Sequence, residues 1–216
     1  MNRHQPSKTE RAHRPIILAS ASPRRRDLLH MLGLTFTVHP SEVEEVIQSD
    51  RSPDKVVQAL AKQKAQSVAS QYETGIVLGA DTVVVDDQSI LGKPKNEEEA
   101  IQMLSRLQGK VHTVYSGLTL IDLDHHLQKI GYRATHVTMK TMSKDQMIKY
   151  VATQEPMDKA GGYAIQGLGA TFVERIEGDY FTVVGQPLSL TADYLSQAGV
   201  DILGLNDNAY NEKAEQ

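Results

Sequence analysis

The 216-residue chain contains no cysteine. This absence excludes a disulfide framework, a catalytic thiolate and a cysteine-ligated zinc site. Long hydrophobic runs are also missing, because no apolar run approaches the roughly 20 residues that span a bilayer. The polar and basic residues 1–14 are not followed by an apolar stretch long enough for a signal peptide. We therefore expect a cytoplasmic protein without a membrane partner.

A strong positive charge is absent as well. The formal net charge at pH 7 is -4, whereas general nucleic-acid binders are usually basic, so no nucleic-acid partner is expected. The chain shows neither an internal repeat nor a low-complexity linker. These observations predict a single domain over residues 15–205, between a disordered N-terminal tail at 1–14 and a frayed C-terminal tail at 206–216.

One basic cluster lies at the start of a predicted helix. The short apolar run at 16–19 predicts a strand, and Ser22 and Pro23 are typical of an N-cap and a first helical residue. Three arginines, residues 24–26, follow at once. Helix amides, serine hydroxyls and arginines together form an anion site, and phosphate is the obvious anion. From these residues alone, a solvated basic helix start is an equal alternative.

Two charged residues interrupt apolar patterns. Residues 75–86 predict a central strand, and Asp81 shares a pleat face there with three valines. A carboxylate in such surroundings is unfavourable unless it is paired or bound, so we expect a functional role for Asp81. Lys64 falls within the apolar stripe of a helix predicted to begin at 52–53. Its ammonium either extends into solvent, the more common outcome, or meets a buried anion.

The rest of the chain alternates helix and strand patterns. Helices are predicted from Asn96, from Ser143 and from Pro187, with a hairpin between the first two. Two further strands are predicted at 170–176 and 180–185. His125 and His126 fall in the hairpin turn, where exposure is favoured over metal binding. The glycine-rich residues 158–169 match neither the phosphate-loop nor the dinucleotide-binding pattern.

These residues suggest chemistry on a phosphorylated molecule. Asp81 and Glu45 are oxygen ligands of the kind that bind hard divalent cations, while Arg24, Lys64 and Lys93 carry charges that neutralise a polyphosphate. Positioning and charge neutralisation are what phosphoryl transfer requires. No Ser-His-Asp order favours acyl transfer. The residues alone therefore predict an enzyme acting on a phosphorylated small molecule, without defining which bond breaks.

Four segments carry a family resemblance: LASASPRRRDLL, GADTVVV, LGKP and DKAGGYAIQGLGATFVERIEGDYFTVVGQPL. They closely resemble the Maf family of nucleoside triphosphate pyrophosphatases, historically called septum formation inhibitors. The resemblance implies an elongated α/β fold, with a central mixed twisted sheet flanked by helices and a cleft between two lobes. It also implies hydrolysis of a nucleoside triphosphate to monophosphate and pyrophosphate with Mg²⁺ or Mn²⁺ as cofactor. A homodimer is left open.

The resemblance also assigns roles to residues. Asp81 matches the family's catalytic aspartate, which is described as the proton acceptor, and is expected to bind metal together with Glu45. The positions tied to substrate choice correspond to Arg24, Thr82 and Gln166. Further polar cleft positions correspond to Ser22, Glu45, Lys64 and Lys93. Arg25 and Arg26 are expected only to support the helix surface.

The segment YAIQG resembles the branch of the family that acts on dTTP and UTP. The amide of Gln166 both donates and accepts, which suits the O4 and N3 edge of a pyrimidine. Two alternatives remain at this point. One is the branch that acts on 7-methyl-GTP, and the other is a nucleotide-binding regulator of cell division without catalysis.

Overall fold

The computed structural model describes residues 14–43, 51–87 and 89–204. The strands are β1 (Ile16–Leu18), β2 (Thr37–Val38), β3 (Ile76–Asp86), β4 (Ser89–Leu91), β5 (Val111–Asp122), β6 (Leu127–Met139) and β7 (Val173–Glu177). The helices are α1 (Pro23–Met31), α2 (Pro53–Ala69), α3 (Glu97–Leu107), α4 (Lys144–Ala152), α5 (Tyr180–Val184) and α6 (Leu188–Gln197). Two 3₁₀ segments are η1 (Ala160–Gly162) and η2 (Gly167–Phe172).

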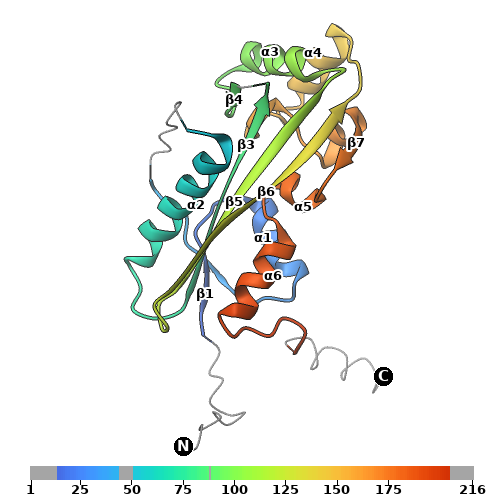
Figure 1. Cartoon of the computed structure of the whole chain (residues 1–216). Helices are drawn as coiled ribbons and strands as arrows, with labels where there is room; N and C mark the ends of the chain where they lie inside the picture. Colours follow the sequence, from blue (N-terminus) through green and yellow to red (C-terminus); the bar gives the residue numbers. More distant parts are fainter. Residues whose placement is uncertain (1–13, 44–50, 88, 205–216) are drawn as a thin grey trace, which may run out of the picture.

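The strands form one mixed, seven-stranded sheet in the order β2-β1-β3-β5-β6-β7, with β4 also paired to β3. β1 is parallel to β2 and β3, while the remaining pairs are antiparallel. The long strands β3, β5 and β6 run together along the molecule and twist (Figure 1). β1 and β4 share one edge of β3, since β5 pairs along the other edge. The expected mixed twisted sheet is confirmed.

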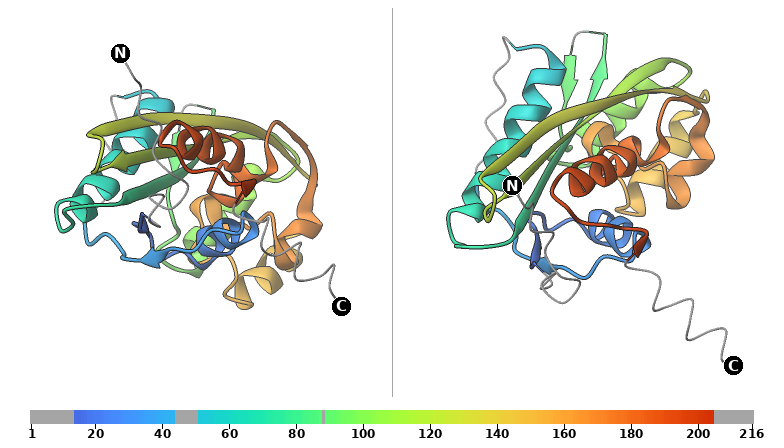
Figure 2. Two further views of the ribbon diagram at one scale, coloured as in Figure 1. Left: turned by 90° about the horizontal axis from the view of Figure 1, so that it is seen from below. Right: turned by 60° about the horizontal axis from the view of Figure 1, so that its bottom comes forward.

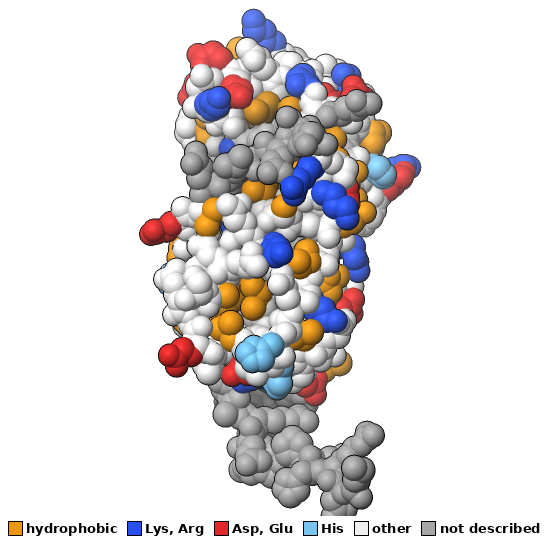
Figure 3. Space-filling model, turned by 60° about the vertical axis from the view of Figure 1, so that its left-hand side comes forward, with side chains coloured by type: hydrophobic (Ala, Val, Ile, Leu, Met, Phe, Trp, Pro, Cys, Tyr) orange, Lys and Arg blue, Asp and Glu red, His pale blue; other side chains and the backbone are white. Residues whose placement is uncertain are grey.

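Helix α2 lies directly against one face of β3 and β5. A side chain at Gly79 would bring a Cβ atom within 2.5 Å of the Ala61 carbonyl oxygen, and one at Gly117 would overlap the backbone of Val57. Glycine at these two positions therefore permits the close approach of the helix backbone. The opposite face of the sheet packs against α6 (Figure 2). Charged side chains of both signs are distributed along the side seen in Figure 3.

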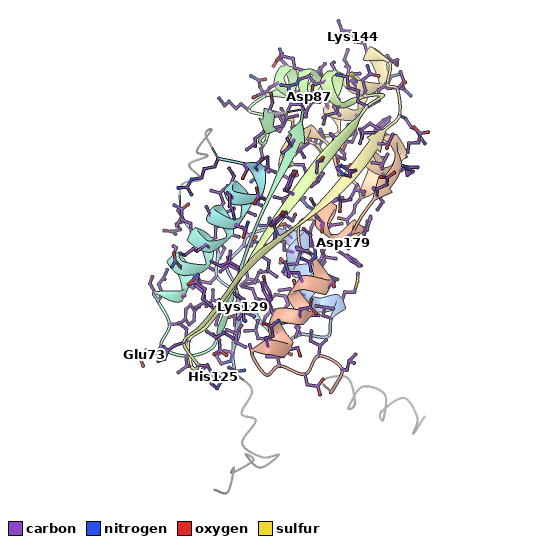
Figure 4. All side chains as sticks on the ribbon, viewed as in Figure 1. Glu73, Asp87, His125, Lys129, Lys144 and Asp179 are labelled. Atoms are coloured by element: carbon purple, nitrogen blue, oxygen red, sulfur yellow. The ribbon has the colours of Figure 1, made fainter. Side chains whose placement is uncertain are left out.

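Two hydrophobic cores lie at opposite ends of the long strands. One contains residues of α3, α4 and the strands beside them, including Val84, Leu104 and Tyr150. The other joins β1, α1 and α6 to the far ends of β3 and β5, and includes Leu29 and Leu78. We call these ends the α3–α4 lobe and the α1–α6 lobe. Figure 4 shows their separation, with Lys144 at one end and His125 at the other.

Helix boundaries follow the sequence signals. Asn96 caps α3 by accepting a hydrogen bond from the amide of Glu99, and Ser143 and Gln146 form a reciprocal capping box at α4. After α1, Gly33 adopts a left-handed conformation with φ of 72°. The amides of Gly33 and Leu34 donate hydrogen bonds to the carbonyls of His30 and Leu29 in the last turn of α1. These bonds give the two carbonyls at the helix end a partner. The predicted helix starts at Asn96 and Ser143 are confirmed.

The strand predicted at 180–185 is wrong, because these residues form α5. Asp179, labelled in Figure 4, accepts hydrogen bonds from the amides of Phe181 and Thr182, which caps a helix. Gly185 then ends the helix with φ of 112°. The apolar run favours a strand by propensity, but this cap and the burial of Val184 against α1 and α6 outweigh it. The preceding predicted strand also begins late, since η2 extends to Phe172.

The ends of the domain are tied together at one point. Arg14, grouped with the tail by sequence, donates a 2.7 Å hydrogen bond to the fully buried carboxylate of Asp122 and another to the carbonyl of Ala198. The remainder of the predicted tails lies outside the described residues, so their disorder stays a prediction. None of the helices that the structure describes has the length and apolar character needed to cross a membrane.

Candidate active site

A pocket of about 390 Å³ opens at the edge of β3 between β1 and β4. β1 pairs with β3 as far as Leu78, and β4 pairs with it from Val84 onward. Neither β1 nor β4 pairs with residues 79–83 of β3. Successive side chains of a strand point to opposite faces. At this open edge, Asp81 from the α2 face and Thr82 from the other face both border the same pocket.

The structure brings seven of the eight sequence-predicted site residues to this pocket. They are Ser22, Arg24, Lys64, Asp81, Thr82, Lys93 and Gln166. The pocket lies between the two lobes, since the start of α1 forms one wall and the segment around η1 forms another. The eighth residue, Glu45, lies outside the described residues. The shared location is established by the geometry, whereas the role of each residue stays a prediction.

Asp81 and Lys64 form a partly enclosed ion pair. Asp81 is 4% exposed, and its Oδ1 atom lies 2.5 Å from the Nζ atom of Lys64. The lysine reaches the sheet from the inner face of α2, so the more common outcome, extension into solvent, is wrong for this residue. A carboxylate removed from water needs such a countercharge. The pair therefore explains how a strand position in an apolar segment accommodates an aspartate.

Arg24 bridges the pocket to the opposite lobe. Its Nη1 atom donates a 3.0 Å hydrogen bond to Oδ2 of Asp158, whose other oxygen accepts from Lys159. Although burial raises the pKa of Asp158, these hydrogen bonds from Lys159 and Arg24 hold it below its usual value. Ser22 is the N-cap residue of α1, as predicted, but its side chain makes no capping hydrogen bond. Two cations and one carboxylate thus meet at this side of the pocket.

Arg25 is a pocket residue, and the expectation that it only supports the helix surface is wrong. Its guanidinium donates to the carbonyl of Gly185 at 2.8 Å, to Ser20 Oγ at 3.1 Å and to Thr82 Oγ1 at 3.3 Å. Arg26, in contrast, is exposed. Adjacent helical residues point about 100° apart, so three consecutive arginines cannot share one environment. The sequence does not reveal how α1 is rotated against the sheet, which decides between them.

Thr82 belongs to a buried hydroxyl chain that sequence reasoning missed. Its Oγ1 lies 2.8 Å from Oγ of Ser116, and Ser116 donates to the carbonyl of Thr182 in α5. Ser116 is fully buried on β5, opposite Thr82 in the strand register. The alternating pattern of β5 gave no reason to single out this serine. These hydrogen bonds fix the orientation of the Thr82 hydroxyl at the pocket wall.

The glycine-rich segment forms the wall contributed by the α3–α4 lobe. The amide of Gly161 donates to the carbonyl of Gly92, which ties this segment to the loop that carries Lys93. Tyr163 borders the pocket, and its hydroxyl oxygen lies 2.7 Å from Nε2 of the buried His112. Burial lowers the pKa of His112 to about 4, so this imidazole is neutral at pH 7. The glycine-rich segment is thereby attached to β5 and to the loop that follows β4.

The described residues contain no group of three or more His, Cys, Asp or Glu side chains able to hold a metal ion. His125 and His126 are exposed in the hairpin turn, where His126 has φ of 51°. The prediction that this pair forms a turn is confirmed. Asp81 is the enclosed carboxylate of the pocket and Asp158 its exposed one.

Comparison with known proteins gives a consistent result. The family model described as Maf-like protein matches residues 15–198. A dTTP/UTP pyrophosphatase of Desulforamulus reducens is 52% identical over 190 residues, covering 88% of this chain and 100% of the relative. A dTTP/UTP pyrophosphatase of Bacillus cereus strain AH820 is 48% identical over 189 residues, covering 88% of this chain and 98% of the relative. The chain therefore belongs to the Maf-like protein family, as the four sequence segments predicted.

Proposed function

We propose that this protein is a nucleoside triphosphate pyrophosphatase that hydrolyses dTTP and UTP to the nucleoside monophosphate and pyrophosphate. The observation that carries the proposal is one pocket that combines the enclosed Asp81 carboxylate with the cations of Arg24, Lys64 and Lys93. The names of the similar proteins from Desulforamulus reducens and Bacillus cereus support it. A cytoplasmic role in removing surplus or modified pyrimidine nucleotides is part of the proposal.

In this reaction a water molecule attacks the α-phosphorus. A new bond forms between that phosphorus and the water oxygen, while the bond from the α-phosphorus to the bridging oxygen breaks. Pyrophosphate leaves with the electron pair, and the water proton passes to the Asp81 carboxylate. Asp81 is placed for this role because Lys64 holds its carboxylate at the pocket wall.

The cations of the pocket stabilise the charge that develops on the leaving group. Catalysis of phosphoryl transfer depends chiefly on positioning and on electrostatic stabilisation. Arg24 and Lys93 approach from different lobes, so a triphosphate bound between them is contacted from two sides. The Arg25 guanidinium, held by three acceptors, adds a fourth positive group at a fixed position. This arrangement fits an extended polyphosphate better than a single phosphate.

We also propose a divalent cation that arrives with the nucleotide, a proposal supported by the Asp81 carboxylate in the pocket. Mg²⁺ is commonly held by one or two carboxylates together with substrate phosphates, so a dedicated cluster of protein ligands is not required. Asp81 is the described residue that would hold the ion, with Glu45 as the second predicted ligand. When bound, such an ion polarises the phosphoryl oxygens and neutralises their charge.

A panel of nucleotides tests the proposed function. Purified protein is incubated with dTTP, UTP, CTP, ATP, GTP and 7-methyl-GTP in the presence of Mg²⁺ or Mn²⁺, and monophosphate and pyrophosphate are quantified. We expect equal amounts of both products and the highest kcat/KM with dTTP and UTP. A preference for 7-methyl-GTP would place the chain in the other branch. Nucleotide binding without hydrolysis in any combination would favour the non-catalytic regulator.

A further inference from the structure

We propose that Glu155 is a positioning residue that sets base preference by holding the backbone segment that carries Gln166. This inference rests on the proposed function and deepens it. Glu155 precedes the glycine-rich segment and is not among the residues that border the pocket. Any effect it has on the nucleotide must therefore pass through the residues that it holds.

Gln166 carries the side-chain amide that is proposed to contact the base. It is exposed at the rim of the pocket, and among the described residues it makes no side-chain hydrogen bond. A side chain without such a partner is directed by the backbone that carries it. The accuracy with which Gln166 presents its amide to a base thus depends on what fixes residues 164–169.

A single carboxylate fixes the C-terminal side of this segment. Oε1 of Glu155 accepts a hydrogen bond of 2.8 Å from the amide of Gly169, and Oε2 accepts one of 2.9 Å from the amide of Leu168. Both amides lie within three residues of Gln166. Although burial raises the pKa of Glu155, hydrogen bonds from these amides and from Tyr150 hold it below its usual value. The group is an ionised acceptor at neutral pH.

Tyr150 extends the same contact to the N-terminal side. Its hydroxyl donates to Oε1 of Glu155 at 2.9 Å and accepts from the amide of Ala164 at 3.1 Å. The carboxylate and the phenol therefore hold the backbone on both sides of Gln166. We call Glu155 and Tyr150 the rear clamp, since neither side chain borders the pocket.

The glycines of the segment fit the rear clamp closely. Gly167 has φ of 62°, and a Cβ atom there would lie 2.5 Å from Oε2 of Glu155. A Cβ atom at Gly169 would lie 2.5 Å from the hydroxyl of Tyr150. The left-handed φ of Gly167 favours glycine there, and a Cβ atom at Gly169 would also overlap the backbone carbonyl oxygen of Ala164. This gives a physical reason for a glycine pattern that matches no phosphate-binding loop.

The test measures base preference, defined as the ratio of kcat/KM for dTTP to kcat/KM for dGTP. It uses Glu155→Gln, Glu155→Ala, Gln166→Ala and the double variant Glu155→Ala/Gln166→Ala. Asp122→Asn is the matched control. The carboxylate of Asp122, at the end of β5 and outside the pocket, also accepts a hydrogen bond from a backbone amide, that of His125 in the hairpin turn. Thermal unfolding is recorded for each variant. Glu155→Gln keeps the shape of the side chain and therefore provides a Glu155 variant that should fold even if Glu155→Ala does not.

We expect Glu155→Ala to lower the base preference about three- to tenfold, mainly through a higher KM for dTTP, because the net value of one or two hydrogen bonds is lost. Glu155→Gln retains one acceptor and loses less. In the Gln166→Ala background, loss of Glu155 changes the preference no further, since the two residues act in series. Asp122→Asn lowers stability but leaves the preference unchanged.

Three outcomes would overturn the inference in distinguishable ways. If Gln166→Ala lowers the preference while both Glu155 variants keep it, the clamp has no role in specificity and the proposed function stands. If the Asp122 control shifts the preference equally, the effect is one of general destabilisation. If Gln166→Ala leaves the preference unchanged, the assignment of base recognition fails and the inference fails with it. Absence of pyrophosphate release from wild-type protein would instead contradict the proposed function itself.

Discussion

The ammonium of Lys64 on α2 and the carboxylate of Asp81 on β3 lie 2.5 Å apart in a pocket at an open sheet edge. Their side chains are only 14% and 6% exposed. Removal of one partner leaves the other charge enclosed, so Lys64→Gln should lower the free energy of unfolding by about 3 kcal/mol and reduce turnover. Urea denaturation measures the first effect. Lys62→Gln on the same helix is the control, and equal losses in both variants would contradict a specific pair.

Arg25 should respond to a change that Arg26 tolerates. Lysine lacks the planar fork that lets Arg25 donate to Gly185, Ser20 and Thr82 together. We expect Arg25→Lys to lower kcat/KM for dTTP by about tenfold or more, and Arg26→Lys to change it by less than about twofold. Steady-state kinetics at several dTTP concentrations decide the matter. Similar kcat/KM values for both variants would contradict a role for Arg25 in the pocket.

The close approach of α2 predicts the effect of one added methyl group. A Cβ atom at Gly117 would overlap the backbone of Val57, whereas the space around Gly92 is open. Gly117→Ala should therefore destabilise the protein by about 2 kcal/mol or more, because rigid backbone must move. Gly92→Ala should be close to neutral in the same thermal unfolding experiment. A Gly117→Ala protein as stable as wild type would show that α2 does not approach the sheet this closely.

Stability should also fall in mild acid because of His112. Burial lowers its pKa from 6.5 to about 4, partly offset by Asp86, so the folded protein binds fewer protons than the unfolded chain between these values. The free energy of unfolding therefore decreases as pH falls through this window, by roughly 3 kcal/mol in total.

Replacement of His112 tests this pH dependence. His112→Gln should flatten the profile between pH 6.5 and about 4, because the titrating group is removed. His126→Asn, at an exposed left-handed position that asparagine tolerates, should keep the wild-type slope. A slope retained in His112→Gln would assign the effect to another group.

Much of this structure could be predicted from local sequence signals. The caps at Asn96 and Ser143, the hairpin and the apolar strand around Asp81 follow from short-range rules and were confirmed. The family resemblance assigned seven site residues that the structure brings to one pocket, six of them within the four family segments. Such signals succeed because each is contained within a few residues.

The predictions that were wrong or missing concern residues whose structure is determined by contacts with distant parts of the sequence. The run at 180–185 has strand propensity, but the Asp179 cap and packing against two other helices make it α5. Arg25 and Ser116 acquire their roles from the rotation of α1 and from a hydroxyl chain across β3 and β5. Lys64 meets an anion only because glycines on the sheet admit α2. No local pattern encodes these distances.

The proposed function requires that Asp81 supports hydrolysis of the nucleotide between the α- and β-phosphates. The most direct test is the rate of pyrophosphate release from dTTP by Asp81→Asn, with nucleotide binding measured in parallel. We expect a folded protein that still binds dTTP but whose kcat falls by at least about 100-fold, since asparagine cannot accept the water proton. An Asp81→Asn protein that keeps most of the wild-type rate would contradict it.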